Sequence, residues 1–463
     1  MYSADLTQDE LKSKPLAILF AMWLLVLPFG AMAISFRLGP IVLYPSLLIG
    51  ILICVLGINS FLSWNKNLLL VSIFIGLWLI QGTYQFLTNQ KTDLALFDVK
   101  ALIYQVITSG VLFSVYSKLG KEFFFKLLLN GLRYFLLVLV VIALFEMTTG
   151  VHIQGAITNK LSDLPISNLH FAPLFTYDNP NNFIAFYLFI LTWIFLLDKS
   201  WGRNVFLMLC FTILGYFIAE FAFSNFGKFS FILLALFLIS IKLITLKRIH
   251  VVFGVVGLSL IGLTLYKNPI FLGPKYENGK NYRINGIIVI KDSLEKMTVM
   301  TKNHLSKTEQ QILINKIDSL EQSIPYKSVD VRKSLIENGV YLIRNNPILG
   351  VGPGQFYQLH IDKKVPHDTG TVTSAHCFPI EIISMYGITG WIYLFLFSFY
   401  FLKIILFKSL NYEGYLRFFL AGIFFVLIWM MPASFIFLEI HRLMLPLLVL
   451  TFLSLKFKQA HDK

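Results

Sequence analysis

The amino-acid sequence predicts an all-α integral membrane protein, with about twelve transmembrane helices and one long helical loop outside the cytoplasm. Three observations support this fold class. Hydrophobic residues make up 56% of the 463-residue chain and charged residues only 14%, whereas about a quarter of the residues of a soluble domain are charged. The mean hydropathy is +0.71. The apolar residues also fall into runs of about 20 residues, the length that a helix needs to cross a bilayer.

These apolar runs define the membrane helices that we expect. The first run has polar flanks and no convincing small-residue cleavage site, so we expect an uncleaved membrane helix there rather than a signal peptide. The runs cover residues 15–35, 41–62, 68–87, 94–117, 127–148, 173–197, 204–222, 227–246, 250–267, 377–402, 416–437 and 441–457.

The basic residues predict how these helices are oriented. An even number of spans puts both termini on one side, and lysine and arginine concentrate on that side, for example at Lys118, Lys199 and Lys247. Because basic loops stay in the cytoplasm, we expect both termini to be cytoplasmic. The net charge of +14 then reflects membrane orientation and gives no reason to invoke nucleic acid.

A polar insertion, residues 268–376, separates the ninth predicted helix from the tenth, and parity places it outside the cytoplasm. Its segment SKTEQQILINKIDSLEQ opens with a capping box, Ser306 to Glu309, and continues with helical spacing. Long loops are usually functional or disordered, and this periodicity argues against disorder. We therefore expect nine membrane helices over 1–267, a helical loop domain over 268–376, and three membrane helices with a cytoplasmic tail over 377–463.

The end of the insertion, SVDVRKSLIENGVYLIRNNP, has the pattern of a second amphipathic helix. Pro347 should end it, because proline cannot continue the helical hydrogen bonding. A glycine-rich stretch, GVGPG, follows. The expected apolar stripe of the helix comprises Val331, Leu335, Val340 and Ile343.

Polar residues from distant segments gather at the outer ends of the predicted helices. Each has a structural alternative, because helix ends carry polar residues for capping or snorkelling. His376 stands out: it opens the tenth helix, where the helix N-terminus disfavours imidazolium, and a neutral imidazole there could act as a base. The group comprises Asn181 in YDNPNNF, Glu220, Asn225, Lys228, Arg332, His376, His441 and Arg442.

Two stretches, VRKSLIENGVYLIRNNPILGVGPGQF and AHCFPIEIISMYGITGWIYLF, resemble the signature region of the O-antigen ligase and polymerase family. Members of that family are bacterial inner-membrane enzymes that act on polyprenyl-pyrophosphate-linked glycans. The shared pattern is an Arg that opens a helix, a Pro and a Gly-x-Gly turn, then a His and a Gly-x-x-Gly. NPNNF also resembles an Asn-rich turn of the family. In this sequence the pattern comprises Arg332, Pro347, Gly350, Gly352, His376, Gly387 and Gly390.

The sequence departs from the family pattern at three places. Cys377 follows the His where Asn is usual, and Met385 stands where Glu is common. The turn between the seventh and eighth helices carries Ser224-Asn225 in place of Ser-Arg. Lys228, one helical turn later, could supply the missing cation, although lysine makes point contacts where arginine makes a bidentate fork.

The resemblance implies a glycosyltransferase: a polymerase of O-antigen or another surface polysaccharide, or a ligase of lipopolysaccharide biosynthesis. Its donor would be a glycan on a lipid such as undecaprenyl pyrophosphate, and its acceptor a glycan or lipid A-core. The protein would lie in the inner membrane with its active site facing the periplasm. Arg332 would stabilise the leaving diphosphate and His376 would be the general base. Substrate contacts would come from Lys228, Asn181, Gly350, Gly352 and Arg442, with the glycines serving equally well as a tight turn.

No metal or other cofactor is expected, because the sequence offers no paired carboxylates for a metal and its histidines are widely spaced. Two other functions stay open. One is a protein O-oligosaccharyltransferase of the same family. The other is a polytopic transporter that flips lipid-linked glycans. A transporter should have broken helices with ionisable groups near the bilayer midplane, whereas Lys100 and Arg133 lie near the ends of predicted helices.

Overall fold

The computed structural model divides into two compact units. Unit 1 comprises Met1–Val138, Ala185–Arg203 and Val331–Lys463, and unit 2 comprises Leu139–Ile184 and Asn204–Asp330. The structure describes residues 8–27, 36–38, 41–43, 45–89, 92–149, 180–198, 205–221, 224–245, 280–284, 287–291, 297–300, 328–369, 373–375, 377–410, 412–430 and 439–456.

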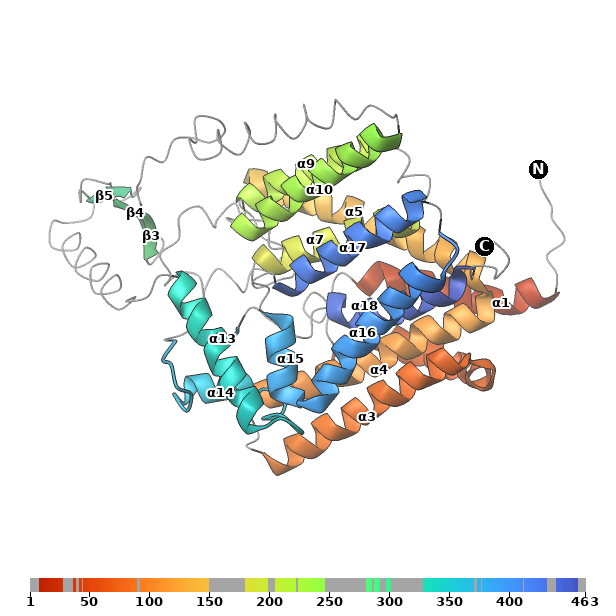
Figure 1. The fold of residues 1–463 in the computed structure, drawn as a ribbon, viewed down its shortest axis with the longest axis horizontal. Coiled ribbons are helices and arrows are strands. Elements are labelled where there is room, and N and C mark those ends of the chain that lie inside the picture. Colours follow the sequence, from red (N-terminus) through yellow and green to blue (C-terminus); the bar gives the residue numbers. More distant parts are fainter. Residues whose placement is uncertain are drawn as a thin grey trace. The chain divides into compact units, whose positions relative to one another are not determined.

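Helices dominate unit 1 (Figure 1). Three helices, α5 (Lys121–Thr149), α7 (Pro180–Leu197) and α13 (Ser328–Asn345), contribute to both units. The short strands β1 (Phe36–Leu38) and β2 (Ile41–Leu43) form an antiparallel pair. The other helices of unit 1 are α1 (Gln8–Val26), α2 (Pro45–Leu56), the 3₁₀ helix η2 (Ile58–Ser63), α3 (Lys66–Thr88), α4 (Asp93–Leu119), α14 (Gln355–Ile361), α15 (Phe378–Tyr386), α16 (Ile388–Phe407), α17 (Tyr412–Met430) and α18 (Glu439–Ser454).

Four of the described helices, α3, α4, α5 and α16, are long and apolar enough to cross a membrane. Shorter apolar helices accompany them. Every predicted apolar run except 250–267 overlaps a described helix, and 250–267 lies outside the described residues. The protein is therefore a helical membrane protein, and its twelve spans stay a prediction.

Local sequence signals account for the ends of α3 and α4. The side chain of Asn65 accepts a hydrogen bond from the backbone N–H of Asn67 at 2.9 Å, and Thr92 accepts one from Ala95 at 3.1 Å. Both satisfy N–H groups that have no partner within the helix. Gly120 ends α4 with φ 74°, a conformation that favours glycine.

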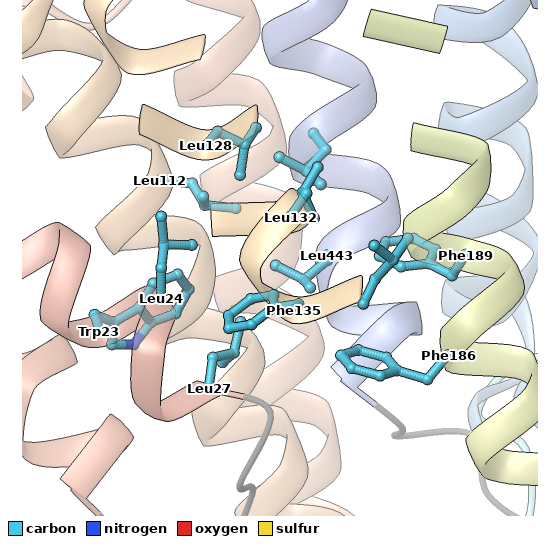
Figure 2. A pocket seen from close by; sticks show the side chains of 12 residues that line it. Trp23, Leu24, Leu27, Leu112, Leu128, Leu132, Phe135, Phe186, Phe189 and Leu443 are labelled. Carbon is cyan, nitrogen blue, oxygen red and sulfur yellow. The ribbon is translucent and has the colours of Figure 1, made fainter. Parts of the chain in front are cut away.

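Helix α4 lies at the centre of unit 1 and contacts α1, α2, α3 and α18. Large apolar side chains fill the core beside it. Figure 2 shows an apolar pocket among these helices, lined by Trp23 of α1, Leu112 of α4, Phe135 of α5, Phe186 of α7 and Leu443 of α18. The pocket offers no polar group for chemistry, so it belongs to the packing of the unit.

The predicted span 377–402 is wrong as a single helix. It forms two helices, α15 and α16, which meet at Gly387. Gly387 has φ 55°, which interrupts the helical backbone. The apolar run continues through the break, and for this reason hydropathy alone does not reveal it.

The amphipathic helix predicted before Pro347 is confirmed as α13, but its buried face differs from the expected stripe. Leu335 and Leu342 are buried, whereas Val331, Val340 and Ile343 are only half-buried. Asn338 is fully buried on the same face. The face therefore includes a polar residue that apolar spacing does not predict.

Unit 2 contains the helix pair α9 (Val205–Phe221) and α10 (Asn225–Thr245). They pack closely at Gly215, where an added Cβ would meet the ring of Phe231. The predicted loop domain also contains an antiparallel sheet of β3 (Lys280–Ile284), β4 (Ile287–Lys291) and β5 (Met297–Met300). The loop is thus not purely helical. The helix predicted over 306–322 lies outside the described residues.

Candidate active site

A glycine turn, residues 346–354, connects α13 to α14. Gly350, Gly352 and Gly354 have φ values of 72°, 102° and 67°, a region that residues with a Cβ rarely adopt. Pro347 stands near its start. Three glycines in five residues therefore allow the backbone to fold back on itself between the two helices.

Amide side chains of α3 hold the carbonyl groups of this turn. Gln85 donates to the carbonyl of Leu349 at 2.7 Å, and Gln81 donates to the same carbonyl at 2.9 Å. Asn89 donates to the carbonyl of Val351 at 3.0 Å. Gln81 and Gln85 lie one helical turn apart on one face of α3, and Asn89, four residues later, caps the C-terminus of the helix.

The turn also pairs with the break between α15 and α16. The N–H groups of Val351 and Gly352 donate to the carbonyls of Ser384 and Met385, both at 2.9 Å. These carbonyls belong to the last turn of α15, where helical partners are missing. An added Cβ on Gly350 would collide with the backbone of Met385. The glycine turn is therefore packed against protein backbone, which accounts for Gly350 and Gly352 without a ligand. Their contribution to substrate binding stays a prediction.

A buried carboxylate network lies next to the turn. Asp98 of α4 accepts a hydrogen bond from the N–H of Gly354 at 2.6 Å. Glu381 of α15 accepts one from the hydroxyl of Ser374 at 2.6 Å and one from the hydroxyl of Tyr357 at 3.2 Å. Both carboxylates are 1% exposed. Asp98 thus connects α4 to the glycine turn, and Glu381 connects α15 to α14 and to the segment before α15.

The tyrosine of this network stays protonated. Burial, followed by the charges of Glu381 and Asp98, raises the pKa of Tyr357 well above its usual range. A phenol that holds its proton can only donate to the carboxylate it faces. The hydroxyl of Tyr357 is thus a permanent donor to Glu381.

Asn338 connects α13 to α14. Its amide group donates to the carbonyl of His367 at 2.8 Å and accepts from the N–H of His367 at 2.9 Å. The same amide lies 3.1 Å from Nε2 of His360, whose Nδ1 lies 2.7 Å from the carbonyl of Phe356. These partners assign the proton to Nδ1 of His360, and burial lowers the pKa of this ring.

Arg332, the predicted diphosphate ligand, is exposed on the first turns of α13. It precedes Asn345 by 13 residues, or about 20 Å at 1.5 Å per residue. The structure therefore does not bring Arg332 to the glycine turn. Arg442 lies near the start of α18, with its guanidinium 5.0 Å from the ring centroid of Tyr104, within the range of a cation–π contact.

The other predicted site residues lie in unit 2 or outside the described residues. Lys228 is 7% exposed and forms an ion pair of 3.0 Å with Glu220. Asn181 is half-buried at the start of α7. His376, the predicted base, lies outside the described residues, although both of its chain neighbours, Ala375 and Cys377, are described.

Several residues of this site were not anticipated from the sequence. The three amides Gln81, Gln85 and Asn89 carry a signal, because polar residues at every fourth position mark one face of an otherwise apolar helix. Asp98 and Glu381 carry a weaker one, as single acidic residues within apolar runs. Most of the hydrogen-bond partners of these five residues lie far away along the chain. The sequence therefore shows that a helix face is polar but does not show which groups that face binds.

Comparison with known families finds a match over nearly half of the chain. Residues 181–395 match a family model described as O-antigen ligase. Neither a curated protein nor a solved structure matches the chain. The matched stretch includes Lys228, Arg332, the glycine turn and the whole of α15. Over residues 181–395, this helical membrane protein is therefore similar to the O-antigen ligase family.

Proposed function

We propose that the protein transfers a glycan from a polyprenyl-diphosphate donor to a hydroxyl group of a glycan acceptor, on the periplasmic face of the inner membrane. The family match over residues 181–395 carries this proposal. The matched residues include helix α13 with Arg332, the glycine turn, and the break between α15 and α16, where the turn donates hydrogen bonds to carbonyl groups. The acceptor would be a growing surface polysaccharide or lipid A-core.

The reaction is a substitution at the anomeric carbon of the donor sugar. The acceptor oxygen forms a bond to this carbon, the bond from the carbon to the diphosphate oxygen breaks, and polyprenyl diphosphate leaves with the bonding electrons. The acceptor proton passes to His376 in its neutral form. Base catalysis of this kind contributes about 10²–10⁴-fold to the rate.

Cationic side chains would stabilise the leaving diphosphate. Arg332 is exposed on α13, so its planar guanidinium is available for bidentate hydrogen bonds to phosphate oxygens. Lys228 already has a carboxylate partner in Glu220. A diphosphate at Lys228 would therefore have to share the ammonium with Glu220 or displace it, and we assign Lys228 the lesser role.

The helix break at Gly387 also bears on the transporter alternative, because broken helices are typical of transporters. Here the hydrogen-bonding groups at the break are used within the protein: the glycine turn pairs with the carbonyls of Ser384 and Met385. The break thus has a structural partner, and the family match favours a transferase. Transport without transfer remains the outcome that would reverse this choice.

The test is glycan transfer by the purified full chain, with a polyprenyl-diphosphate-linked oligosaccharide as donor. We expect release of polyprenyl diphosphate and a glycosylated acceptor, and a loss of about 10²–10⁴-fold in His376→Gln. His367→Gln, the same change at an exposed ring, should retain the activity. Separate reactions with lipid A-core, a lipid-linked repeat unit or a peptide identify the acceptor. Flipping of the donor in proteoliposomes with no transfer to any acceptor would contradict the proposal.

A further inference from the structure

We propose that the tip of the glycine turn, Ile348 and Leu349, is inserted into the lipid bilayer and contacts acyl chains in the leaflet at the C-terminal end of α3. The tip belongs to residues 268–376, which the sequence alone predicts as a polar loop domain outside the membrane. The inference concerns a surface of the protein and does not depend on the proposed function.

Both side chains of the tip are large, apolar and exposed. Ile348 is 67% exposed and Leu349 is 50% exposed. Single exposed apolar residues are normal on protein surfaces and need no explanation. The argument for lipid therefore depends on what surrounds these two side chains.

The tip adjoins the exposed apolar surfaces of two membrane helices. The carbonyl of Leu349 accepts its hydrogen bond from Gln81 of α3, and Leu77, one helical turn before Gln81, is 59% exposed. The carbonyl of Ile348 accepts a hydrogen bond from the N–H of Ile388, the first residue of α16, at 2.9 Å. Ile388 is exposed as well. Because α3 and α16 are both long and apolar enough to cross a membrane, the tip continues a surface that faces lipid.

The same helices indicate how deep the tip lies. Gln81 and Gln85, which hold the tip, precede the last residue of α3 by seven and three residues, or about 5–10 Å along the helix axis. Leu87, nearer the end than both amides, is still exposed, so the apolar surface of α3 extends past the level of the tip. Tyr84 and Trp391 are exposed near the same ends of α3 and α16, and these residue types are enriched at the membrane–water interface. The tip thus lies near the boundary between headgroups and acyl chains.

The hydrogen bonds of the turn suit this position. An irregular backbone segment at membrane depth must find partners within the protein, because an unpaired N–H or C=O group in hydrocarbon costs several kcal/mol. Here the carbonyl of Ile348 is bound by Ile388, and the carbonyls of Leu349 and Val351 are bound by the amides of α3. The N–H groups of Val351 and Gly352 donate to carbonyls of α15. The protein therefore supplies partners that water supplies to a loop in solution.

The test measures whether lipid or water surrounds the tip. Ile348→Cys in the full chain, reconstituted into lipid vesicles, carries a nitroxide spin label. Oxygen concentrates among acyl chains and a neutral nickel chelate stays in water, so the ratio of their collision rates with the label separates the two environments. The background for labelling lacks the native cysteines Cys54, Cys210 and Cys377.

Two control sites of similar exposure bracket the result. Leu77→Cys, within α3, is the reference for lipid. Ile361→Cys is the reference for water, because Ile361 is 53% exposed and the charged residues 362–364 follow it. We expect the oxygen-to-nickel ratio at position 348 to lie closer to that at position 77 than to that at position 361.

Two outcomes would overturn the proposal. A ratio at position 348 equal to that at position 361 would place the tip in water. Slow collisions with both reagents would mean that another part of the protein covers the tip. Leu349→Cys, labelled in the same way, provides the measurement if the label at position 348 prevents folding.

Discussion

At the scale of single residues, the two arginines of α13 differ in their position along the helix. Both Arg332 and Arg344 are exposed, so replacing either should change the unfolding free energy by no more than about 0.5 kcal/mol. Arg344 lies in the last turn, where a cation favours the helix dipole. Arg332 lies near the opposite end, and the helix offers it no comparable structural role.

We predict that Arg332→Ala abolishes glycan transfer while the amount of protein in the membrane is unchanged. Arg332→Lys should restore little, because an ammonium group cannot make the bidentate contact of a guanidinium. Arg344→Ala is the matched control and should retain most of the activity. Transfer by purified protein, normalised to membrane abundance, measures this difference. Equal losses in both alanine variants would mean that Arg332 acts through the helix rather than on the donor.

His360 predicts a pH dependence of stability. Burial lowers its pKa from the ordinary value of 6.5, so the unfolded chain takes up a proton at a pH where the folded chain does not. Stability is therefore complete above pH 6.5 and falls as the pH decreases toward the lowered folded value. We expect the unfolding temperature to decrease between pH 7.5 and pH 5.5, and His360→Gln to remove part of that decrease. At pH 8 the ring of His360 is neutral in both the folded and the unfolded chain. The difference in unfolding temperature between the wild type and His360→Gln at this pH therefore measures the lost hydrogen bonds alone.

At the scale of elements, Gly354 of the glycine turn and Gly76 of α3 predict opposite effects of a change to alanine. Gly354 has φ 67°, and an added Cβ would collide with the backbone at Leu94 and Ala95. Gly354→Ala should therefore destabilise the fold by about 1–3 kcal/mol. Gly76 lies within α3, and no atom lies within 4 Å of its added Cβ. Gly76→Ala should stabilise by about 0.5–1 kcal/mol, because alanine loses less backbone entropy in a helix.

Thermal unfolding of the two variants beside the wild type measures this contrast. A lower unfolding temperature for Gly354→Ala and a slightly higher one for Gly76→Ala are expected. If Gly354→Ala unfolds at the wild-type temperature, the close contact between the turn and α4 is not present in the protein.

Elements with a strong local signal could be predicted, and those that depend on distant partners could not. The spacing of Leu335 and its neighbours predicts α13, and Pro347 predicts its end to within a few residues. The break at Gly387 is different, because it exists where the turn supplies N–H groups to the carbonyls of α15. Hydrophobic periodicity indicates which face of a helix is buried, but it does not indicate that a distant turn will bind the carbonyl groups at the end of α15.

At the scale of the whole molecule, composition predicts a helical membrane protein, and this is confirmed. The orientation rests on the positions of basic residues such as Lys118, which lies in the last turn of α4. The approach of residues 349–351 to α3 is not visible in the sequence, because it joins segments more than 260 residues apart. This part of the site is a tertiary property that neither composition nor spacing contains.

We predict that Lys118, Lys199 and Lys247 are cytoplasmic and that residues 268–376 are not. A variant in which Cys54, Cys210 and Cys377 are replaced provides a background free of thiols. Ser306→Cys in this background should react with an impermeant maleimide in cells whose outer membrane is permeable, and Lys118→Cys should react only after lysis. Labelling of Ser306→Cys only after lysis would reverse the orientation.

The hydrogen bond from Gln85 to the carbonyl of Leu349 spans 264 residues, and this separation has a consequence for biogenesis. Ribosomes add about 5–20 residues per second, so α3 emerges roughly 13 to 50 seconds before Leu349 exists. During that interval the nascent protein contains the amides of Gln81, Gln85 and Asn89, but the carbonyl groups that they later bind have not yet been synthesised. Helix α3 is thus synthesised early, and its amide side chains form these hydrogen bonds only late in synthesis. Substitutions of these amides should lower the yield of inserted protein, as well as the stability of the finished fold.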